Sequence, residues 1–371
     1  MDFLIIGAGI NGMLLARELA AENAQVLLLE MGECCREASW AGGGIVSPLY
    51  PWRYRQSVTA LASWAQDFYP RLAEDLLVST GIDPELCRTG LLMLDADDED
   101  LALRWAAVNR RPMERVGPTF IYDREPGLGE GFEKGLWMPE VANIRNPRLG
   151  QALLMDLNSR PNVTVREHSP VVRIHSSGEH IENVVVQNEG AARRYQADRV
   201  ILCAGAWTGI LAEQLDLKLP VEPVKGQMLL YRPASLPVKS IVLTAGRYVI
   251  PRRDGHLLVG STLEYEGFDK RVTPEARTSL QQSAERLVPC LRGSEPVTQW
   301  AGLRPAASEG VPYIGKLPGY DNLFVNAGQF RNGLVLAPAS ARLLADILLG
   351  RETIVDPVPY SPREGRLSAG K

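Results

Sequence analysis

The N-terminal part of the chain alternates short apolar runs with a helical pattern. Residues 2–6 (DFLII) form the first apolar run, and apolar residues then recur near helical spacing from Met13 to Asn23. A second apolar run covers residues 25–29 and ends at Glu30. The pattern predicts a strand, a helix and a second strand, which together make a βαβ unit.

Two later segments repeat the pattern of an apolar run followed by glycine. Residues 199–203 end shortly before Gly205, and residues 322–326 end shortly before Gly328. The second segment leads into a long apolar helical pattern that ends at Gly350, and glycine is typical of the end of a helix. We therefore expect two more strands and a C-terminal helix.

Three further helices are predicted in the middle of the chain. Residues 57–80 and 273–289 have helical patterns. Asn146-Pro147 has the residue types of an N-cap and a first helical position, so we expect a helix from there toward Leu157.

A β-hairpin is predicted in RYVIPRRDGHLLVGSTLE. Asp254-Gly255 separates two β-like runs and supplies the positive φ angles of a two-residue turn. We expect His256, just past the turn, to be a solvated loop histidine. Arg252 and Arg253 are expected to belong to a solvated turn rather than to a nucleic-acid-binding patch.

Length, charge and cysteine usage narrow the class of function. A chain of 371 residues exceeds the size at which one hydrophobic core stops growing, so we expect two interleaved domains. A formal net charge of −4 argues against binding to nucleic acid or to an anionic membrane. Five cysteines without a C-x-x-C pair suggest neither a disulfide framework nor a zinc site. With no leader or membrane span apparent, we expect a cytoplasmic protein that acts on small molecules.

The segment after the first strand has a dinucleotide-binding fingerprint. Gly7 suits the tight turn, Gly9 lets the backbone approach a pyrophosphate, and Gly12 lets the helix pack on the strand. The N-terminus of the helix then faces the phosphates. Glu30 ends the next strand, where its carboxylate accepts hydrogen bonds from the adenosine ribose hydroxyls.

Two glycine-rich segments outside the fingerprint favour FAD over NAD. Ser39 to Gly44 (SWAGGG) is a loop of small residues whose amides can approach a flat ring system. Asn326 to Gly333 (NAGQFRNG) opens a second helix, whose positive end faces the edge of a flavin where negative charge develops on reduction.

With these segments, the sequence resembles the D-amino acid oxidase family of flavoproteins, and most closely the glycine oxidases of thiamine biosynthesis. The resemblance extends over nearly the whole chain, and its most specific blocks are WAGLRPAASEGVPYIG and NAGQFRNGLVLAPAS. It implies an α/β fold with a split Rossmann-like FAD-binding domain of the glutathione-reductase/D-amino acid oxidase type and an antiparallel-sheet, α+β substrate domain. The expected division is 1–50, 140–220 and 297–360 for the FAD domain, 51–139 and 221–296 for the substrate domain, and 361–371 as a polar tail without regular structure.

The resemblance also implies the site residues. Arg304 and Tyr248 match the residues that hold the substrate carboxylate in the family, and Arg331 matches an arginine at the edge of flavin and substrate. Gly44 stands where a better-known relative has a methionine over the flavin. The implied cofactor contacts are Gly7, Gly9, Ile10, Asn11, Gly12, Glu30, Met31, Glu37, Ala38, Gly42, Gly43, Gly44, Val171, Gly328, Gln329, Phe330, Arg331, Asn332, Gly333, Leu334 and Val335.

Departures from the family pattern bear on the pocket and on flavin attachment. Gly44 and the bulky stretch 47–54 suggest a roomier or reshaped pocket, and we expect Trp40 and Trp52 near the ligand. Relatives with covalent flavin use a cysteine in the C-terminal third, and none follows Cys290 here. We therefore expect non-covalent FAD, although Cys34 and Cys35 lie near the cofactor loop.

The resemblance implies an oxidase that converts glycine, sarcosine, D-proline or D-amino acids to the imino acid. Flavin N5 accepts the hydride, O₂ reoxidises the flavin to give H₂O₂, and the imine is handed to thiazole synthesis. No acid–base residue is required, because the flavin carries the hard chemistry and the protein supplies position and electrostatics. The alternatives are a D-amino acid dehydrogenase that reduces a quinone and a flavin-binding protein without turnover. The resemblance further suggests a homo-oligomer.

Overall fold

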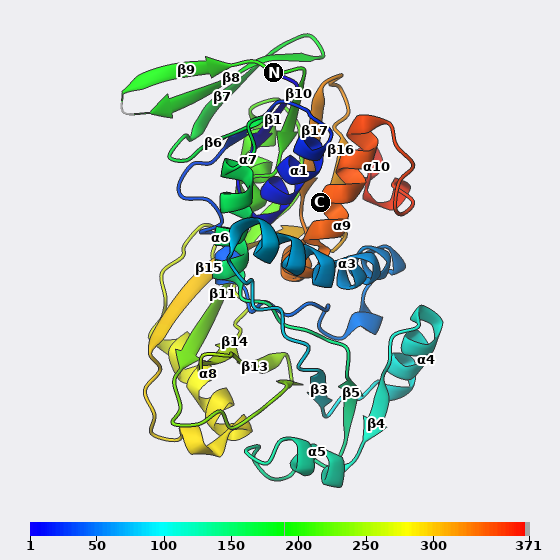
Figure 1. Ribbon diagram of the computed structural model, residues 1–371, viewed down its shortest axis with the longest axis vertical. Coiled ribbons are helices and arrows are strands. Elements are labelled where there is room, and N and C mark those ends of the chain that lie inside the picture. The colour runs from blue at the N-terminus through cyan, green and yellow to red at the C-terminus, as the bar shows by residue number, and fades with distance from the viewer. Residues whose placement is uncertain (189, 368–371) are drawn as a thin grey trace.

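The computed structural model describes residues 1–188 and 190–367, and its upper half in Figure 1 is built on a six-stranded sheet. The strand order is β16-β17-β10-β1-β2-β6, and every neighbouring pair is parallel except β16 and β17. The strands are β1 (Phe3–Ile6), β2 (Val26–Leu29), β6 (Val163–Arg166), β10 (Arg199–Leu202), β16 (Tyr313–Lys316) and β17 (Leu323–Ala327).

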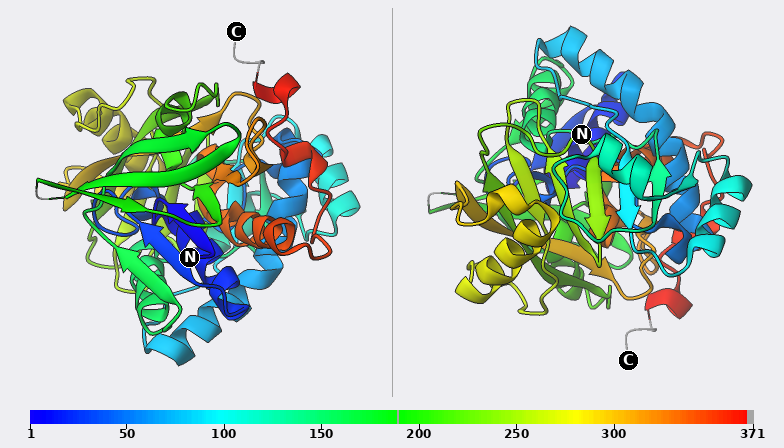
Figure 2. Two further views of the ribbon diagram at one scale, coloured as in Figure 1. Left: turned by 90° about the horizontal axis from the view of Figure 1, so that it is seen from above. Right: turned by 90° about the horizontal axis from the view of Figure 1, so that it is seen from below.

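Both faces of this sheet are covered, which explains why β1 and β2 are apolar at every position. Alternate residues such as Ile5 and Leu28 face a layer of helices, and Leu4 and Leu27 face the opposite layer. The helical layer contains α1 (Ile10–Ala21), α3 (Gln56–Thr80), α6 (Asn146–Asn158) and α9 (Gly333–Leu349). The opposite layer contains α7 (Thr208–Glu213) and a three-stranded sheet, seen from above in Figure 2, of β7 (Val171–Ser177), β8 (His180–Asn188) and β9 (Ala191–Tyr195).

The lower half is built on an eight-stranded sheet of order β15-β11-β14-β13-β12-β3-β5-β4. Its pairs are antiparallel except β12 and β3, which are parallel. The strands are β3 (Leu91–Leu94), β4 (Glu114–Val116), β5 (Gly135–Met138), β11 (Val221–Tyr231), β12 (Ile241–Thr244), β13 (Arg247–Pro251), β14 (Leu257–Gly260) and β15 (Thr298–Ala307). The remaining helices are α2 (Ala38–Ala41), α4 (Glu99–Asn109), α5 (Pro118–Arg124), α8 (Pro274–Leu287) and α10 (Glu364–Leu367).

The predicted fold class is confirmed, with a mostly parallel sheet in one half and a mostly antiparallel sheet in the other. The strands of the parallel sheet come from three separated parts of the chain, as a split domain requires. Two elements pack with the other half of the molecule than the one to which the expected domain boundaries assigned them. Strand β15 pairs with β11 in the lower sheet, and α3 packs its buried face in the same core as α1 and α9.

Three local predictions were wrong. The Arg252 amide donates to His256 O and the Gly255 amide donates to Arg252 O, so the hairpin has a three-residue turn in which only Gly255 has positive φ. Asn146 is not an N-cap, because the helix is preceded by Arg145 and the Asn146 side chain donates to Ser39 O. The segment after Ser361 is ordered as far as Leu367; residues 368–371 lie outside the described chain.

Arg366 explains why the start of the predicted tail is ordered. Its side chain is buried and donates hydrogen bonds to the carbonyl oxygens of Val311 and Pro312 and to the carboxylate of Glu309. Its guanidinium also lies 4.3 Å from the centre of the Tyr313 ring. One long polar side chain thus fixes a segment that has no apolar pattern of its own.

Among the described residues, one helical stretch is long and apolar enough to cross a membrane by its length and composition alone. It covers Phe330–Leu349 and includes α9. Of its 18-residue apolar window, 72% is buried inside the protein, where α9 packs in one core with β1, α1 and α3. The apolarity of α9 is therefore explained by its place in the protein core.

This placement predicts the effect of truncating a leucine in α9. Leu343 is fully buried, so Leu343→Ala should lower the free energy of unfolding by about 2–5 kcal/mol. Leu77→Ala in α3 is the matched control, because Leu77 is 43% exposed and its change should stay within about 0.5 kcal/mol. Urea denaturation followed by circular dichroism measures both values, and equal stability of the two variants would contradict the core position of α9.

Candidate functional site

A cavity of about 350 Å³ lies where the two large sheets meet. Residues at or just past the carboxyl ends of β1, β2, β10 and β17 line one side of it, as expected for ligand sites in open parallel sheets. The start of α9, residues of β13 and β15, the segment 37–49 and residues 169–171 and 204–214 also contribute to the lining. The cavity is therefore shared by both halves of the molecule.

Close backbone packing shapes the fingerprint at one end of the cavity. A Cβ atom on Gly7 would lie 2.5 Å from Cys203 O, and one on Gly12 would lie 2.0 Å from Gly7 O. Gly7 also has a φ of 106°, which disfavours any other residue. Because these positions carry no side chain, the first turn of α1 reaches the cavity, which Ile10 and Asn11 line. The amide of Ile10 donates to Ser39 Oγ at 3.0 Å.

Glu30 lies at the end of β2 and lines the same part of the cavity. Its carboxylate is buried and accepts hydrogen bonds from the Ala8 amide at 2.8 Å and the Gly32 amide at 3.1 Å. Burial raises the pKa of Glu30 more than these two amides lower it. The two hydrogen bonds fix the carboxylate, and its remaining lone pairs are available to hydroxyl groups of a ligand.

Gly42, Gly43 and Gly44, at the end of the loop 39–44, form the wall of the cavity next to β13 of the lower sheet. A Cβ atom on Gly43 would lie 3.2 Å from the Tyr248 hydroxyl oxygen. Gly44 has a φ of 74°, and its Cβ would lie 2.0 Å from Ile144 O. Gly44 is therefore required by the backbone, and the missing side chain would point at Ile144 rather than into the cavity. The reasoning that Gly44 itself enlarges the pocket was wrong.

The segment between β17 and α9 lines the opposite wall. The side-chain amide of Gln329 donates to Asn326 Oδ1 at 2.6 Å, and both residues are buried. Arg331 is exposed and lines the cavity near the start of α9. Together with α1, this places the N-terminal ends of two helices at one cavity.

Arg304 reaches the cavity from β15. Its Nη1 donates to Lys225 O at 3.3 Å and to Thr262 O at 3.2 Å, and its Nη2 donates to Ser261 Oγ at 2.7 Å. Burial lowers the pKa of Arg304, and no described carboxylate forms an ion pair with it. The absence of a side chain on Gly226 makes room, because a Cβ there would lie 2.1 Å from Arg304 Nη1. A half-buried cation without a carboxylate partner suits an anionic ligand.

Tyr248 lines the cavity from β13, the strand for which we predicted it. It is 6% exposed, and its hydroxyl lies 4.0 Å from Met228 Sδ and interacts with the side chain of Arg304. Side chains alternate along β13, so Tyr248 and Ile250 lie on one face of the lower sheet and Val249 lies on the opposite face. Its hydroxyl group therefore has hydrogen-bonding capacity left for a ligand.

Most of the predicted contact residues line the cavity, but Gly12, Gly328 and Asn332 do not. Trp40 and Trp52 do not line it either, so their expected place near the ligand was wrong. Trp40 packs against Trp300, and Trp52 lies in the core of the lower half. Trp207 was missed: it lines the cavity, and its position five residues after β10 was the available signal.

Three buried asparagine atoms at the cavity support its use as a cofactor site. Asn11 Oδ1, Asn146 Oδ1 and Asn326 Nδ2 have no hydrogen-bond partner in the described chain, and all three residues line the cavity. Buried polar atoms without partners are costly, so they point to a polar ligand. FAD fits this set, because its phosphates, ribityl hydroxyls and ring edges offer both donors and acceptors.

Comparison with known proteins identifies the ligand class. Residues 2–347 match the DAO family model, described as FAD dependent oxidoreductase. The glycine oxidase of Pseudomonas aeruginosa is 53% identical over 98% of this chain and 99% of its own length. The bifunctional protein ThiO/ThiG of Trichormus variabilis is 30% identical over 95% of this chain, which spans 53% of that longer protein.

A solved structure has the same fold. The crystal structure of glycine oxidase from Geobacillus kaustophilus superimposes with a TM-score of 0.89 at 30% sequence identity, over 98% of each chain. The chain therefore belongs to the DAO family of FAD-dependent oxidoreductases and is an FAD-dependent amino acid oxidase similar to the glycine oxidases.

Proposed function

We propose that this enzyme oxidises glycine and other small amines, among them sarcosine, D-proline and D-amino acids, and reduces O₂ to H₂O₂. The observation that carries the proposal is Arg304, a half-buried cation that forms no ion pair with a described carboxylate, at a cavity that Tyr248 also lines. The similarity to glycine oxidases of Pseudomonas and Geobacillus supports the choice of substrates. When bound, FAD supplies the acceptor for the hydride from substrate Cα and passes the electrons to O₂.

Arg304 and Tyr248 hold the substrate carboxylate and thereby orient its Cα. A guanidinium fork bonds a carboxylate in two places, which fixes its plane better than a lysine ammonium does. The backbone and serine oxygens on the far side of Arg304 keep the fork in place. The neighbouring positive charge of Arg331 lowers the pKa of Arg304 further and adds to the attraction for an anion.

The amine loses its proton before hydride transfer, without a catalytic base from the chain. No described histidine or aspartate lines the cavity. Of the two carboxylates that line it, Glu30 is held by backbone amides and Glu37 is paired with Lys270 at 2.7 Å. The chain's contribution to the reaction is therefore position and electrostatics.

Two further parts of the proposal concern flavin attachment and product use. Non-covalent FAD is supported by the thiols of Cys34 and Cys35, which are buried and do not line the cavity. Burial raises the pKa of Cys34, and it raises that of Cys35 to about 12. Release of the imine to thiazole formation in thiamine biosynthesis is supported by the relative whose name joins ThiO to ThiG.

The central prediction is reduction of the bound flavin by glycine in the absence of oxygen. Glycine, sarcosine or D-proline should bleach the flavin absorbance, whereas L-alanine should not. Admitting air should restore the absorbance rapidly and produce H₂O₂. Slow recovery in air but rapid recovery with a quinone would indicate a dehydrogenase, and no bleaching by any amine would contradict the proposal.

A second prediction concerns Arg304. Arg304→Ala should retain FAD and raise the KM for glycine by about 10- to 100-fold, because one charge-assisted hydrogen-bonded pair is lost. Arg304→Lys should show a smaller increase, since it keeps the charge without the fork. Arg194→Ala, on exposed strand β9, is the control. Steady-state kinetics measure KM, and an unchanged value for Arg304→Ala would remove Arg304 from the site.

A third prediction concerns the pH dependence of FAD affinity. Ribose hydroxyls that donate to Glu30 favour its ionised form, whereas burial raises the Glu30 pKa above the usual 4.5 in the free protein. FAD affinity should therefore be full above this raised pKa and fall as the pH drops through it. Glu30→Gln should bind FAD more weakly with a flattened pH profile in this range.

Titration of the flavin-free protein with FAD, followed by fluorescence, measures this affinity. An unchanged pH profile in Glu30→Gln would contradict the ribose role of Glu30.

Flavin that stays with the acid-denatured protein, instead of being released to the supernatant, would contradict non-covalent attachment.

A further inference from the structure

Arg252 places a buried positive charge behind the glycine-rich wall of the cavity. We expected this residue in a solvated turn, but it is 7% exposed. Its Nη2 donates to Gly43 O at 2.8 Å, and its Nη1 donates to Ile144 O at 3.0 Å and Asn143 Oδ1 at 2.9 Å. The side chain thus joins the β13–β14 hairpin to two segments of the upper half.

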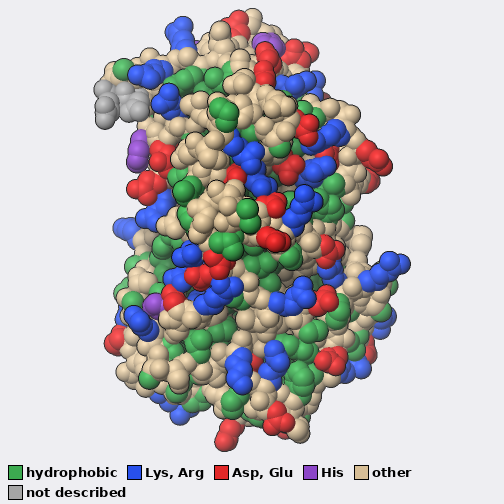
Figure 3. All heavy atoms as spheres, in the orientation of Figure 1, with side chains coloured by type: hydrophobic (Ala, Val, Ile, Leu, Met, Phe, Trp, Pro, Cys, Tyr) green, Lys and Arg blue, Asp and Glu red, His purple; other side chains and the backbone are tan. Residues whose placement is uncertain are grey.

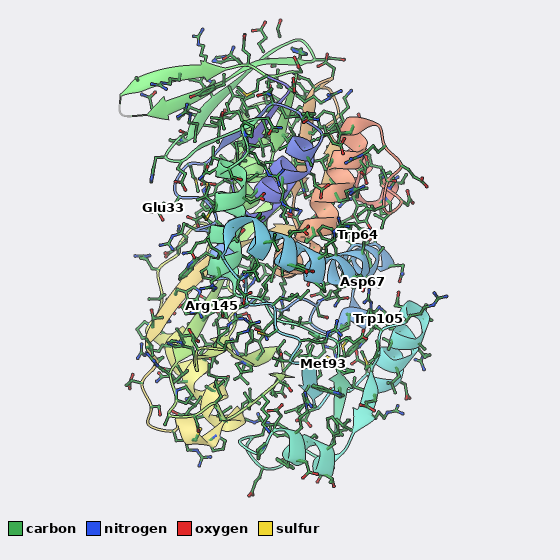
Figure 4. The ribbon with its side chains drawn as sticks, in the orientation of Figure 1. Glu33, Trp64, Asp67, Met93, Trp105 and Arg145 are labelled. Atoms are coloured by element: carbon green, nitrogen blue, oxygen red, sulfur yellow. The ribbon has the colours of Figure 1, made fainter. Side chains whose placement is uncertain are left out.

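The charge of Arg252 is not neutralised by a direct carboxylate partner. All three of its acceptors are neutral, and within the described residues it forms no ion pair. Glu85 and Asp254 attract it from farther away, but they pair with Arg145, which lies between the two halves in Figure 4. Burial lowers the pKa of Arg252 to about 10, so the guanidinium stays charged at neutral pH.

The contact with Gly43 O fixes the direction of the next amide. In a trans peptide the carbonyl and the following N–H point in opposite directions. The Gly43 carbonyl points at Arg252, so the Gly44 N–H points away from it. Gly44 lines the cavity and Arg252 does not. Neither the Gly43 nor the Gly44 amide donates to another described residue, which leaves both available to a ligand.

We propose that Arg252 is a positioning residue that directs the Gly44 N–H at the flavin ring and strengthens it as a hydrogen-bond donor. A hydrogen bond from a cation to the carbonyl polarises the peptide and makes its N–H more positive. A stronger donor at the ring stabilises the negative charge that the flavin gains on reduction. This inference rests on the binding of FAD and not on the identity of the amine substrate.

The arrangement separates Arg252 from Arg304. Arg304 lines the cavity and has room for a carboxylate ligand, whereas Arg252 lies behind the loop and acts only through the backbone. Arg252 should therefore affect the electron affinity of the flavin and leave the binding of the substrate carboxylate unchanged. A residue that merely stabilises the fold would not change the electron affinity of the flavin while leaving the binding of the substrate carboxylate unchanged.

The adjacent arginine offers a matched control. Arg253 is half exposed and pairs with Asp83 on the surface at 2.6 Å. Arg252→Met and Arg253→Met make the same chemical change one residue apart, with the first behind the loop and the second outside it. Arg252→Lys retains a positive charge but cannot reach three acceptors as a planar fork does.

Sulfite provides a test that needs no amine, because it adds reversibly to oxidised flavin and its affinity rises with positive polarity at the ring. With the FAD-loaded enzymes, Arg252→Met should raise the sulfite dissociation constant about tenfold or more. Arg253→Met should change it less than about twofold, as expected for a surface ion pair. The sulfite dissociation constant of Arg252→Lys should lie between those of the two methionine variants. The flavin midpoint potential should fall most in Arg252→Met, less in Arg252→Lys and least in Arg253→Met. The KM for glycine should change little in all three variants.

Equal sulfite constants for Arg252→Met and Arg253→Met would overturn the proposal. So would a loss of FAD affinity in Arg252→Met with an unchanged sulfite constant, because that pattern indicates a structural role only. If Arg252→Met does not fold, an unchanged sulfite dissociation constant in Arg252→Lys would also overturn the proposal. A sulfite response as expected, without reduction by any amine, would instead contradict only the proposed function.

Discussion

The tight packing of β1 and α1 against the end of β10 determines how the cofactor side of the cavity is built. A side chain on Gly7 or Gly12 would overlap backbone oxygens of Cys203 or Gly7. Because these atoms are so close, the first turn of α1 opens into the cavity instead of being covered by side chains. Glu30 depends on the same contact, since its carboxylate accepts from the Ala8 amide between the first two glycines.

The lower sheet contributes charge rather than backbone to the cavity. Arg304 and Arg252 both lie at the meeting of the sheets, and both are bonded to neutral oxygens rather than to carboxylates. Removing a cation from water is costly, and neutral acceptors offset only part of that cost. A carboxylate ligand at Arg304 would offset part of this desolvation cost. A reduced flavin beside the Gly43–Gly44 peptide, to which Arg252 donates, would do the same for Arg252. Under the roles proposed for Arg304 and Arg252, the unneutralised charges would favour binding of an anion and reduction of the cofactor.

The sequence predicted the parts of this structure that depend on local pattern. The apolar runs identified β1, β2, β10 and β17, and the glycine spacing identified the end of the cavity where the first turn of α1 lies. Arg304 and Tyr248 came only from the family resemblance, because nothing in X-Arg-Pro or in a strand tyrosine distinguishes a ligand from a structural residue.

Predictions failed where distant contacts override local preference. Asn146 has the chemistry of an N-cap, yet its side chain turns to Ser39 and leaves Oδ1 at the cavity. Arg252 looked solvated beside Asp254-Gly255, but its acceptors are more than a hundred residues away along the chain. Lys and Arg are interspersed with Asp and Glu over the face shown in Figure 3, so a charge in the sequence does not by itself identify a site. No local window contains these partners.

The conformation of Gly44 changes how substrate selection in this enzyme must be explained. Its absent side chain would collide with Ile144 O, so the space beside it is already filled by backbone. Selection among small amines must depend on side chains that do face the cavity, such as Ile45, Leu49 and Trp207. Apolar contacts of this kind discriminate by only about 1–3 kcal/mol per methylene. If Arg304 anchors the carboxylate as proposed, and the rest of the substrate contacts mainly apolar groups, the site is expected to accept several small amines.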